Sequence, residues 1–229
     1  MRQLFAAALL AALLFSAAAF GAEQKKLVPV AGGAYSVVVP DGWIADANAQ
    51  YRAVMLSDKA DSECALTLAA PNPILHSGQL ISMELASLSK DGVDAEIIEG
   101  VMDKKDGMTR LRVHFAAPLD DSEALVGLMH LLTFEDCAIM MIATAPDSAF
   151  DAFVEEAEEV MNSIRIDAAA IAENRDGYAA VGVALKEDTI KELLGDNYGN
   201  PKMMEQIRDY IDSLEPFEMP EEETVEKAG

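Results

Sequence analysis

Three histidines, His76, His114 and His130, are the side chains best suited to proton transfer in this chain of 229 residues. Nucleophilic hydrolysis needs a nucleophile on a strained turn and a histidine that takes its proton. The chain has no G-x-S-x-G sequence, and Ser77, which follows His76, stands where a helix can begin with serine as its N-cap. The other two histidines fall in apolar runs typical of strands, where packing in the sheet is the commoner role. The sequence therefore predicts no catalytic residue and no enzyme.

Metal and cofactor motifs are also missing from the sequence. The 2 cysteines and 3 histidines show neither C-x-x-C nor H-x-x-x-H spacing, which argues against zinc and dithiol chemistry. No P-loop sequence is present. Two acidic loops are candidates for weak binding of a divalent cation: Asp58, Asp61 and Glu63, and Asp120, Asp121 and Glu123. Neither has the spacing of a calcium loop, so no metal site or cofactor is predicted.

Methionine pairs at 140–141 and 203–204 raise the alternative of a copper site. Both pairs lie on apolar stripes of the sequence. A methionine on such a stripe more often fills a core, so core packing is expected for both.

A disulfide between Cys64 and Cys137 is predicted. Each cysteine lies at the end of a predicted strand, and neighbouring strand ends can bring Cα atoms within the ~4.4–6.8 Å that a bridge requires. Export would place the pair in an oxidising compartment, and an even number leaves no cysteine without a partner. The alternative is two buried free thiols that pack as small apolar side chains.

Trp43 and one acidic helix ridge are the candidates for contact with a protein partner. Trp43 follows the tight turn Pro40-Asp41-Gly42, where it could be exposed or could cover a sheet edge. The ridge consists of Asp151, Glu155, Glu158 and Asn162 at helical spacing. A solvated helix face is the alternative to a docking surface for a basic partner.

Alternating apolar residues and turn signals predict the sheet that positions these side chains. The predicted strands are 35–39, 51–56, 64–69, 96–102, 109–116, 125–134 and 138–145, with a short closing segment at 163–166. Asp-Gly at 106–107 and Glu-Asp at 135–136 mark hairpin turns. The strands at 125–134 and 138–145 are so apolar that we expect them in the centre of the sheet, buried on both faces.

Two amphipathic helices accompany the strands. Ser77 is predicted to cap a helix that runs to about Lys90. A longer helix follows 146–148, because apolar residues from Phe150 to Ile164 recur every three or four positions while four glutamates fall largely off this stripe.

The chain changes character beyond Asp167. The apolar run 178–185 fits a strand or a helix, and a short helix is predicted over 188–194. Asn200 followed by Pro201 starts a further helix. The segment from about 216 to 229 is predicted to be disordered.

Residues 1–21 have the features of a secretory signal peptide. Arg2 precedes an apolar run from Leu4 to Phe15, and 19–21 offer small residues before a predicted cleavage after Gly21. A membrane anchor is the alternative, but charged residues follow at once and the run is rich in alanine. No later stretch approaches the ~18 apolar residues of a membrane span. We expect bacterial export to the periplasm or the medium, without stable membrane insertion after cleavage.

The formal net charge of -23, from 17 basic and 40 acidic residues, is the strongest feature of the composition. Such a chain repels nucleic acid and anionic lipid, so neither is an expected partner. The acidic residues are spread along the chain, which is typical of a surface kept in solution by repulsion. A basic partner or divalent cations are the alternative explanation.

The order of these elements resembles the PsbP-like/DcrB-like family of extracytoplasmic domains. The resemblance rests on Tyr35-Ser36-Val37-Val38-Val39-Pro40-Asp41-Gly42-Trp43 and on the helix and closing segment from Phe153 to Ile166, and it covers about 33–166. It implies an α+β fold in which a mostly antiparallel sheet has helices on both faces, an α/β/α sandwich. It implies binding or assembly more often than catalysis and supplies no catalytic residues. The 168–229 region departs from the pattern, so a partner surface of the family can be covered or replaced here.

Three regions are therefore expected: a signal peptide at 1–21, a PsbP-like α/β/α domain at 22–167, and an acidic, mainly helical extension at 168–229. The expected function is a non-catalytic binding or assembly role in the cell envelope, with an envelope protein as the partner. The alternative is an envelope hydrolase or a small-ligand binder that uses a cleft beside the sheet.

Overall fold

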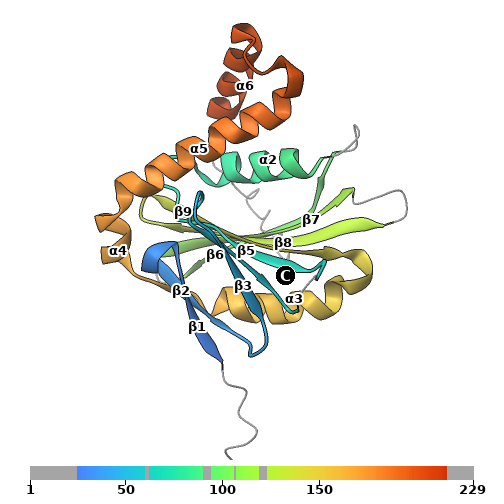
Figure 1. The fold of residues 1–229 in the computed structure, drawn as a ribbon, viewed down its shortest axis with the longest axis vertical. Helices are drawn as coiled ribbons and strands as arrows, with labels where there is room; N and C mark the ends of the chain where they lie inside the picture. Colours follow the sequence, from blue (N-terminus) through green and yellow to red (C-terminus); the bar gives the residue numbers. More distant parts are fainter. Residues whose placement is uncertain (1–24, 60–61, 90–93, 106, 119–122, 216–229) are drawn as a thin grey trace, which may run out of the picture.

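A seven-stranded sheet forms the centre of the molecule (Figure 1). The computed structural model describes residues 25–59, 62–89, 94–105, 107–118 and 123–215. Neighbouring strands follow the order β3-β4-β5-β9-β8-β7-β6, and each neighbouring pair is antiparallel. The strands are β3 (Ile44–Asn48), β4 (Ala53–Ser57), β5 (Ala65–Leu68), β6 (Glu96–Lys105), β7 (Met108–Pro118), β8 (Ala124–Phe134) and β9 (Cys137–Pro146).

One face of this sheet is covered by helix α3 (Asp147–Asn162) and by a small sheet. The small sheet has the order β1-β2-β10 and consists of β1 (Lys26–Val30), β2 (Tyr35–Val39) and β10 (Arg165–Ile166), with a short 3-10 helix η1 (Ala31–Gly33) after β1. The predicted apolar stripe of α3 is buried against the sheet at Phe150, Phe153, Ala157, Val160 and Met161. The hydroxyl of Tyr35 donates a hydrogen bond of 2.7 Å to the carbonyl of Ala69 and so ties the small sheet to the large one.

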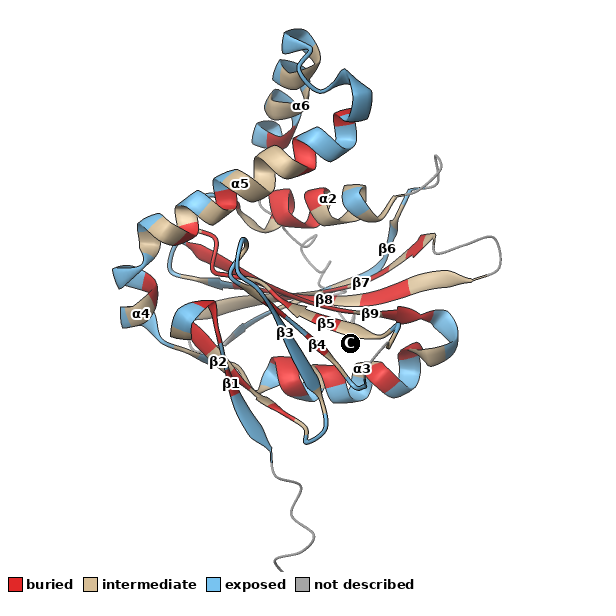
Figure 2. Ribbon diagram, in the orientation of Figure 1, coloured by how far each residue is buried: buried red, intermediate tan, exposed pale blue. Residues whose placement is uncertain are grey.

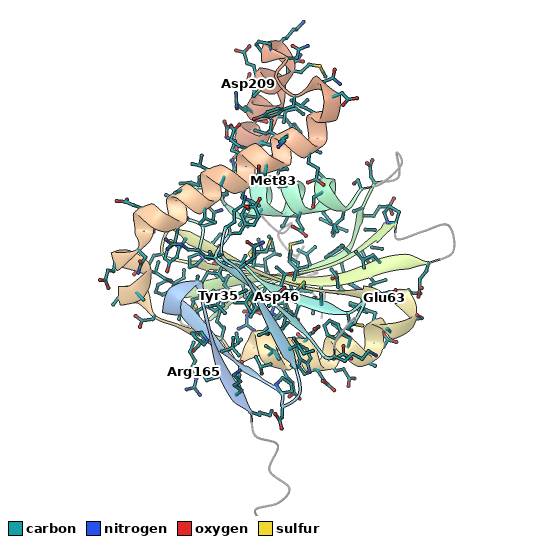
Figure 3. All side chains as sticks on the ribbon, in the orientation of Figure 1. Tyr35, Asp46, Glu63, Met83, Arg165 and Asp209 are labelled. Atoms are coloured by element: carbon teal, nitrogen blue, oxygen red, sulfur yellow. The ribbon has the colours of Figure 1, made fainter. Side chains whose placement is uncertain are left out.

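The other face is covered by helices α2 (Ser77–Leu88), α5 (Arg175–Leu194) and α6 (Pro201–Ser213), while α4 (Ala168–Glu173) and the 3-10 helix η2 (Gly195–Asn197) connect elements of the extension. Figure 1 shows α2 and α5 on the side of the sheet opposite to α3. In Figure 3, Met83 on α2 and Tyr35 on β2 lie on these two sides. The structure therefore confirms the predicted α+β class, with helices on both faces of an antiparallel sheet.

Strands β8 and β9 are buried over most of their length, as predicted for central strands (Figure 2). Successive side chains of a strand point to opposite faces, so Met140 packs in the core below α2 and Met141 in the core above α3. Met203 and Met204 pack at the edge of the α2-side core. Both methionine pairs thus contribute to packing.

Two strands and one long helix differ from the sequence-based prediction. Residues 26–30 were not among the predicted strands, but they pair with β2 as β1. Strand β3 was not predicted, because all five of its residues are exposed and it lacks an alternating pattern. Helix α5 joins the unassigned run 178–185 and the predicted short helix 188–194 into one helix of 20 residues.

The predicted signal peptide and the predicted disordered tail lie outside the described residues. Among the residues that are described, no helix is both long and apolar enough to cross a membrane.

Candidate functional site

A cavity of about 270 Å³ lies between the large sheet and helices α2 and α5. Its floor comes from alternate residues of β4, β5 and β9, which point toward the helices. These floor residues include Ala53, Met55, Thr67, Met140 and Ile142. Leu80 and Glu84 of α2, together with Val181 and Leu185 of α5, form the opposite wall. The cavity is thus mainly apolar and is shared between the main domain and the extension.

Met55 marks a place where this cavity reaches solvent. It lies on the floor, yet 46% of its surface is exposed. Large apolar side chains at the mouth of a concave site are common where a ligand covers them.

Glu84 is the charged residue in the cavity lining. Burial, and to a smaller extent the charge of nearby Glu192, raises the pKa of its carboxyl group from 4.5 to about 7. Within the described part of the chain, this carboxyl group makes no hydrogen bond and no ion pair. A carboxyl group that faces apolar walls without a partner is unfavourable in its charged form. The protonation state of Glu84 should therefore depend on pH and on whether a ligand is bound.

Asp188 of α5 fixes the rim of the cavity. Its Oδ2 accepts a hydrogen bond of 2.6 Å from the hydroxyl of Tyr51 and one of 3.3 Å from Nε2 of Gln50. The hydrogen bond to Asp188 is the main reason why the pKa of Tyr51 is raised, and burial and the charges of Asp188 and Glu192 add to it. The rim therefore joins α5 to the turn between β3 and β4 and carries negative charge.

A second hollow, of about 250 Å³, lies on the α3 face of the sheet and contains the histidine that a hydrolase would need. Its polar lining residues are Glu99, Arg112, His114 and Glu158. The ring of His114 stacks on Phe150 with 5.2 Å between centroids, and His130, next to this hollow, is fully buried. The structure thus brings two histidines close to Glu158, a grouping that the sequence did not predict.

His130 is nevertheless poorly suited to act as a general base. Burial, and then the charges of Arg110 and Arg112, lower its pKa from 6.5 to about 3. Its Nε2 lies 3.7 Å from Oε1 of Glu158, and neither ring nitrogen has a hydrogen-bond partner among the described residues. The ring is therefore neutral near pH 7, and its contact with Glu158 is not an ion pair there.

The described residues that line the second hollow also include no hydroxyl or thiol nucleophile. Its lining contains no serine, threonine or cysteine. Oε1 of Glu158 already accepts a hydrogen bond of 3.1 Å from Arg112. Hydrolysis by a serine or cysteine nucleophile needs that group and a base within hydrogen-bond reach of each other, and the described lining of this hollow does not supply such a pair.

His76 has a structural position at the start of α2. Its Nδ1 accepts a hydrogen bond from the backbone N–H of Gln79, and the Gln79 side chain accepts one from the backbone N–H of His76. This reciprocal pair is a capping box. The predicted N-cap was Ser77, so the helix begins one residue earlier than expected, with the imidazole ring in the capping role.

The predicted disulfide between Cys64 and Cys137 is wrong, because both cysteines are free. Cys64 comes directly before β5, whose first residue, Ala65, pairs with Thr144 of β9. Cys137 is at the other end of β9, about 23 Å from Thr144 at ~3.3 Å per residue. The two cysteines do lie at strand ends, but at opposite ends of the same pair of strands.

Trp43 and Glu158, two of the predicted partner-binding residues, are engaged within the molecule. The Trp43 ring stacks on Phe153 with 5.6 Å between centroids, and its Nε1 donates a hydrogen bond to Glu156. Glu158 pairs with Arg112. Asp151 and Glu155 are exposed on α3, so only part of the predicted ridge is a free surface.

The described residues of the two acidic loops do not come together as a metal site. Asp58 accepts a hydrogen bond from Ser62, and Glu123 accepts hydrogen bonds from Ser148. Asp61, Asp120 and Asp121 lie outside the described residues. Among the residues that can be described, no group of three or more metal-binding side chains is present.

Glu84 is the residue of the site that the sequence analysis missed. It is three residues after Ile81 and one before Leu85, so it falls on the predicted apolar face of α2. An acidic residue in such a stripe is the sequence signal that would have found it. Val181 and Leu185 of α5 could not be found in this way, because the run 178–185 was not assigned to a helix or a strand.

Comparisons with known proteins support the fold. No family model matches the chain, and no curated protein matches it. The solution structure of cyanobacterial PsbP (CyanoP) from Synechocystis sp. PCC 6803 is similar with a TM-score of 0.51 at 14% identity, over 64% of this chain and 95% of that one. Weaker similarities are found to a crystal structure from Bacteroides thetaiotaomicron, with a TM-score of 0.41 at 12% identity over 82% of this chain and 69% of that one, and to a protein of unknown function from Pseudomonas aeruginosa, with a TM-score of 0.37 at 10% identity over 60% and 93%. The chain thus has a PsbP-like fold.

Proposed function

We propose that this chain is an exported, non-catalytic protein of the cell envelope that binds a small, mainly apolar ligand in the cavity between the large sheet and helices α2 and α5. The cavity of about 270 Å³ is the observation that carries the proposal. Small-molecule sites are typically concave and apolar, with a few polar groups that orient the ligand. The signal-like residues 1–21 support the proposed location.

The size of the cavity limits the ligand. One water molecule occupies ~30 Å³ in the liquid, so the cavity holds the equivalent of about nine non-hydrogen atoms. Straight-chain alcohols are suitable probes. Each buried CH₂ contributes ~0.8 kcal/mol, which corresponds to an affinity increase of about fourfold for each carbon.

Titration calorimetry with the series from 1-butanol to 1-decanol tests the proposal. We expect affinity to rise about fourfold per carbon up to about 1-octanol and then to level off, because longer chains no longer fit. Thr67→Phe fills the floor of the cavity and should weaken 1-octanol binding at least tenfold. Thr133→Phe is the matched control, since Thr133 is exposed on β8 and does not line the cavity.

Two results would contradict the proposal. An affinity that keeps increasing for alcohols longer than eight carbons would indicate binding to an open surface. Equal binding by the native protein and by Thr67→Phe, with both folded by circular dichroism, would place the alcohols elsewhere.

An envelope protein partner is the second candidate. Strand β6 is at the edge of the large sheet and carries exposed Ile97, Ile98 and Val101. An exposed apolar edge strand can add a strand from another chain. If the alcohols do not bind, this candidate replaces the first.

A further inference from the structure

We propose that the ligand of this cavity is a primary alkylammonium ion, whose apolar chain lies on the floor from β4, β5 and β9 and whose ammonium group meets Glu84. The inference rests on the proposed function and specifies the class of its ligand.

The unpaired carboxyl group of Glu84 is the first argument. It lines an otherwise uncharged cavity, and no described residue gives it a hydrogen bond. A neutral apolar ligand would remove water from this group and leave it without a donor, which is unfavourable. An ammonium group supplies three donors and a compensating charge.

The charge of the surroundings is the second argument. Asp188 is held at the rim by Tyr51, and Glu192 is close enough to raise the pKa of Glu84. The described lining contains no lysine, arginine or histidine. A ligand with a carboxylate or phosphate group would therefore meet negative charge and no basic partner, whereas a cation is complementary to the site.

Two basic residues of the neighbouring helices, Lys186 and Arg208, are paired with other carboxylates, which is the third argument. Lys186 of α5 pairs with Asp212, and Arg208 of α6 makes hydrogen bonds to both carboxylate oxygens of Glu187. Neither is among the residues that line the cavity. The negative charge of Glu84 is thus left for an external cation.

Protonation of Glu84 makes the proposed binding sensitive to pH. The pKa of about 7 means that the carboxyl group is mostly neutral at pH 5.5 and mostly ionised at pH 8. An alkylammonium ion, with a pKa of about 10 like that of lysine, is charged at both pH values. Among the described residues, Glu192 of α5 is the charged group that acts on Glu84, and the phenol of Tyr51, bonded to Asp188, lines the same cavity. Affinity for the amine should therefore increase about tenfold from pH 5.5 to pH 8, while affinity for the alcohol of equal length should not change.

The experiment compares n-octylamine, 1-octanol and octanoate by titration calorimetry of the purified protein at pH 8. We expect octylamine to bind at least tenfold more tightly than octanol, and octanoate to bind most weakly. Glu84→Gln should weaken octylamine binding about tenfold and leave octanol binding within threefold. The matched control is Glu173→Gln, which removes the same charge from an exposed position of α4 outside the cavity lining and should change neither affinity.

Each other outcome has a distinct meaning. If octanol binds and octylamine binds no better, the alkylammonium inference is overturned and the proposed function stands. If Glu84→Gln and Glu173→Gln weaken octylamine equally, net charge is the cause and the inference also fails. If neither octanol nor octylamine binds, the proposed function itself is overturned.

Discussion

At the scale of single residues, Glu84 and His130 affect the pH dependence of folding in opposite directions, because burial favours the neutral form of each. The raised pKa of Glu84 means that the folded state holds more protons than the unfolded state between pH 4.5 and about 7. Its contribution to stability is therefore lost as the pH rises through this range. The lowered pKa of His130 means that the folded state holds fewer protons between about pH 3 and 6.5, so stability is lost as the pH falls.

Replacement of His130 by leucine should remove the acid sensitivity that this residue causes. Between pH 7 and pH 4 we expect the His130→Leu protein to lose about 3 kcal/mol less of its free energy of unfolding than the native protein does, because no buried imidazole must then stay neutral. Urea unfolding followed by circular dichroism at the two pH values measures this difference. Equal losses for the two proteins would mean that the pKa of His130 is not lowered in the folded state.

The cysteines and Glu84 show how far single residues could be predicted from the sequence. Both cysteines were placed correctly at strand ends, but which ends are neighbours depends on the strand order β5-β9, which brings together residues far apart in the chain. Glu84 could be recognised as part of a site only once the position of α5 was known, because α5 is also far from α2 in the chain. Residue types and local spacing thus predicted the element in which a residue lies. Which residues from distant parts of the chain it contacts depends on the topology of the sheet and helices.

At the scale of elements, the close approach of α5 to the loop before α2 depends on Gly182. A Cβ atom on Gly182 would lie 2.7 Å from Cγ1 of Ile74 and 2.8 Å from Oδ1 of Asn72. Asn72 is buried, and its Oδ1 accepts hydrogen bonds from the backbone N–H groups of Ile74 and Leu75. It cannot move aside without losing them, so α5 would have to shift away from the cavity.

Two alanine substitutions in the same helix test this contact. Alanine favours a helix over glycine by ~1 kcal/mol. Gly182→Ala should still lower the free energy of unfolding by about 1–2 kcal/mol, because the clash with Asn72 outweighs this gain. Gly177→Ala is the control and should be neutral or stabilising by up to ~1 kcal/mol, since the atoms nearest to its new methyl group belong to the guanidinium at the end of the flexible, exposed Arg52 side chain. Urea midpoints measure both; a Gly182→Ala protein as stable as Gly177→Ala would show that α5 is not held closely at this point.

The elements of the PsbP-like region were predicted better than those of the extension, and the reason is physical. Helix α3 buries one continuous stripe against one face, so its period is visible in the sequence. Helix α5 contacts one core through Tyr178 and the other through Ile190. Its buried residues therefore do not follow a single stripe, and its two glycines oppose a helix assignment. Strand β3 is an exposed edge strand that is defined only by its pairing with β4.

At the scale of the whole molecule, the extension is an integral part of the fold. Tyr178 is 1% exposed, and its hydroxyl donates a hydrogen bond of 2.8 Å to the carbonyl of Ala31. Ile190, Leu194 and Ile211 are buried in the core between α2 and the sheet. The Gln79 side chain of α2 donates a hydrogen bond of 3.0 Å to the carbonyl of Ile211 in α6. The 22–167 and 168–229 regions expected from the sequence thus share a core and the walls of the cavity.

Deletion of 168–229 should therefore expose the α2 side of the sheet and strongly destabilise the rest. Burial of each large apolar side chain contributes ~1.5–3 kcal/mol, so the loss of Tyr178, Ile190, Leu194 and Ile211 alone removes about 6 kcal/mol or more, comparable to the whole stability of many domains. We expect the truncated protein to melt at least ~10 °C lower and to bind the hydrophobic dye ANS. The control is deletion of 216–229 only, which keeps α4, α5 and α6 and should leave melting and dye fluorescence unchanged. If both truncated proteins behave like the full chain, the helices of the extension do not stabilise the sheet, and the cavity that they wall would not be a stable feature of the molecule.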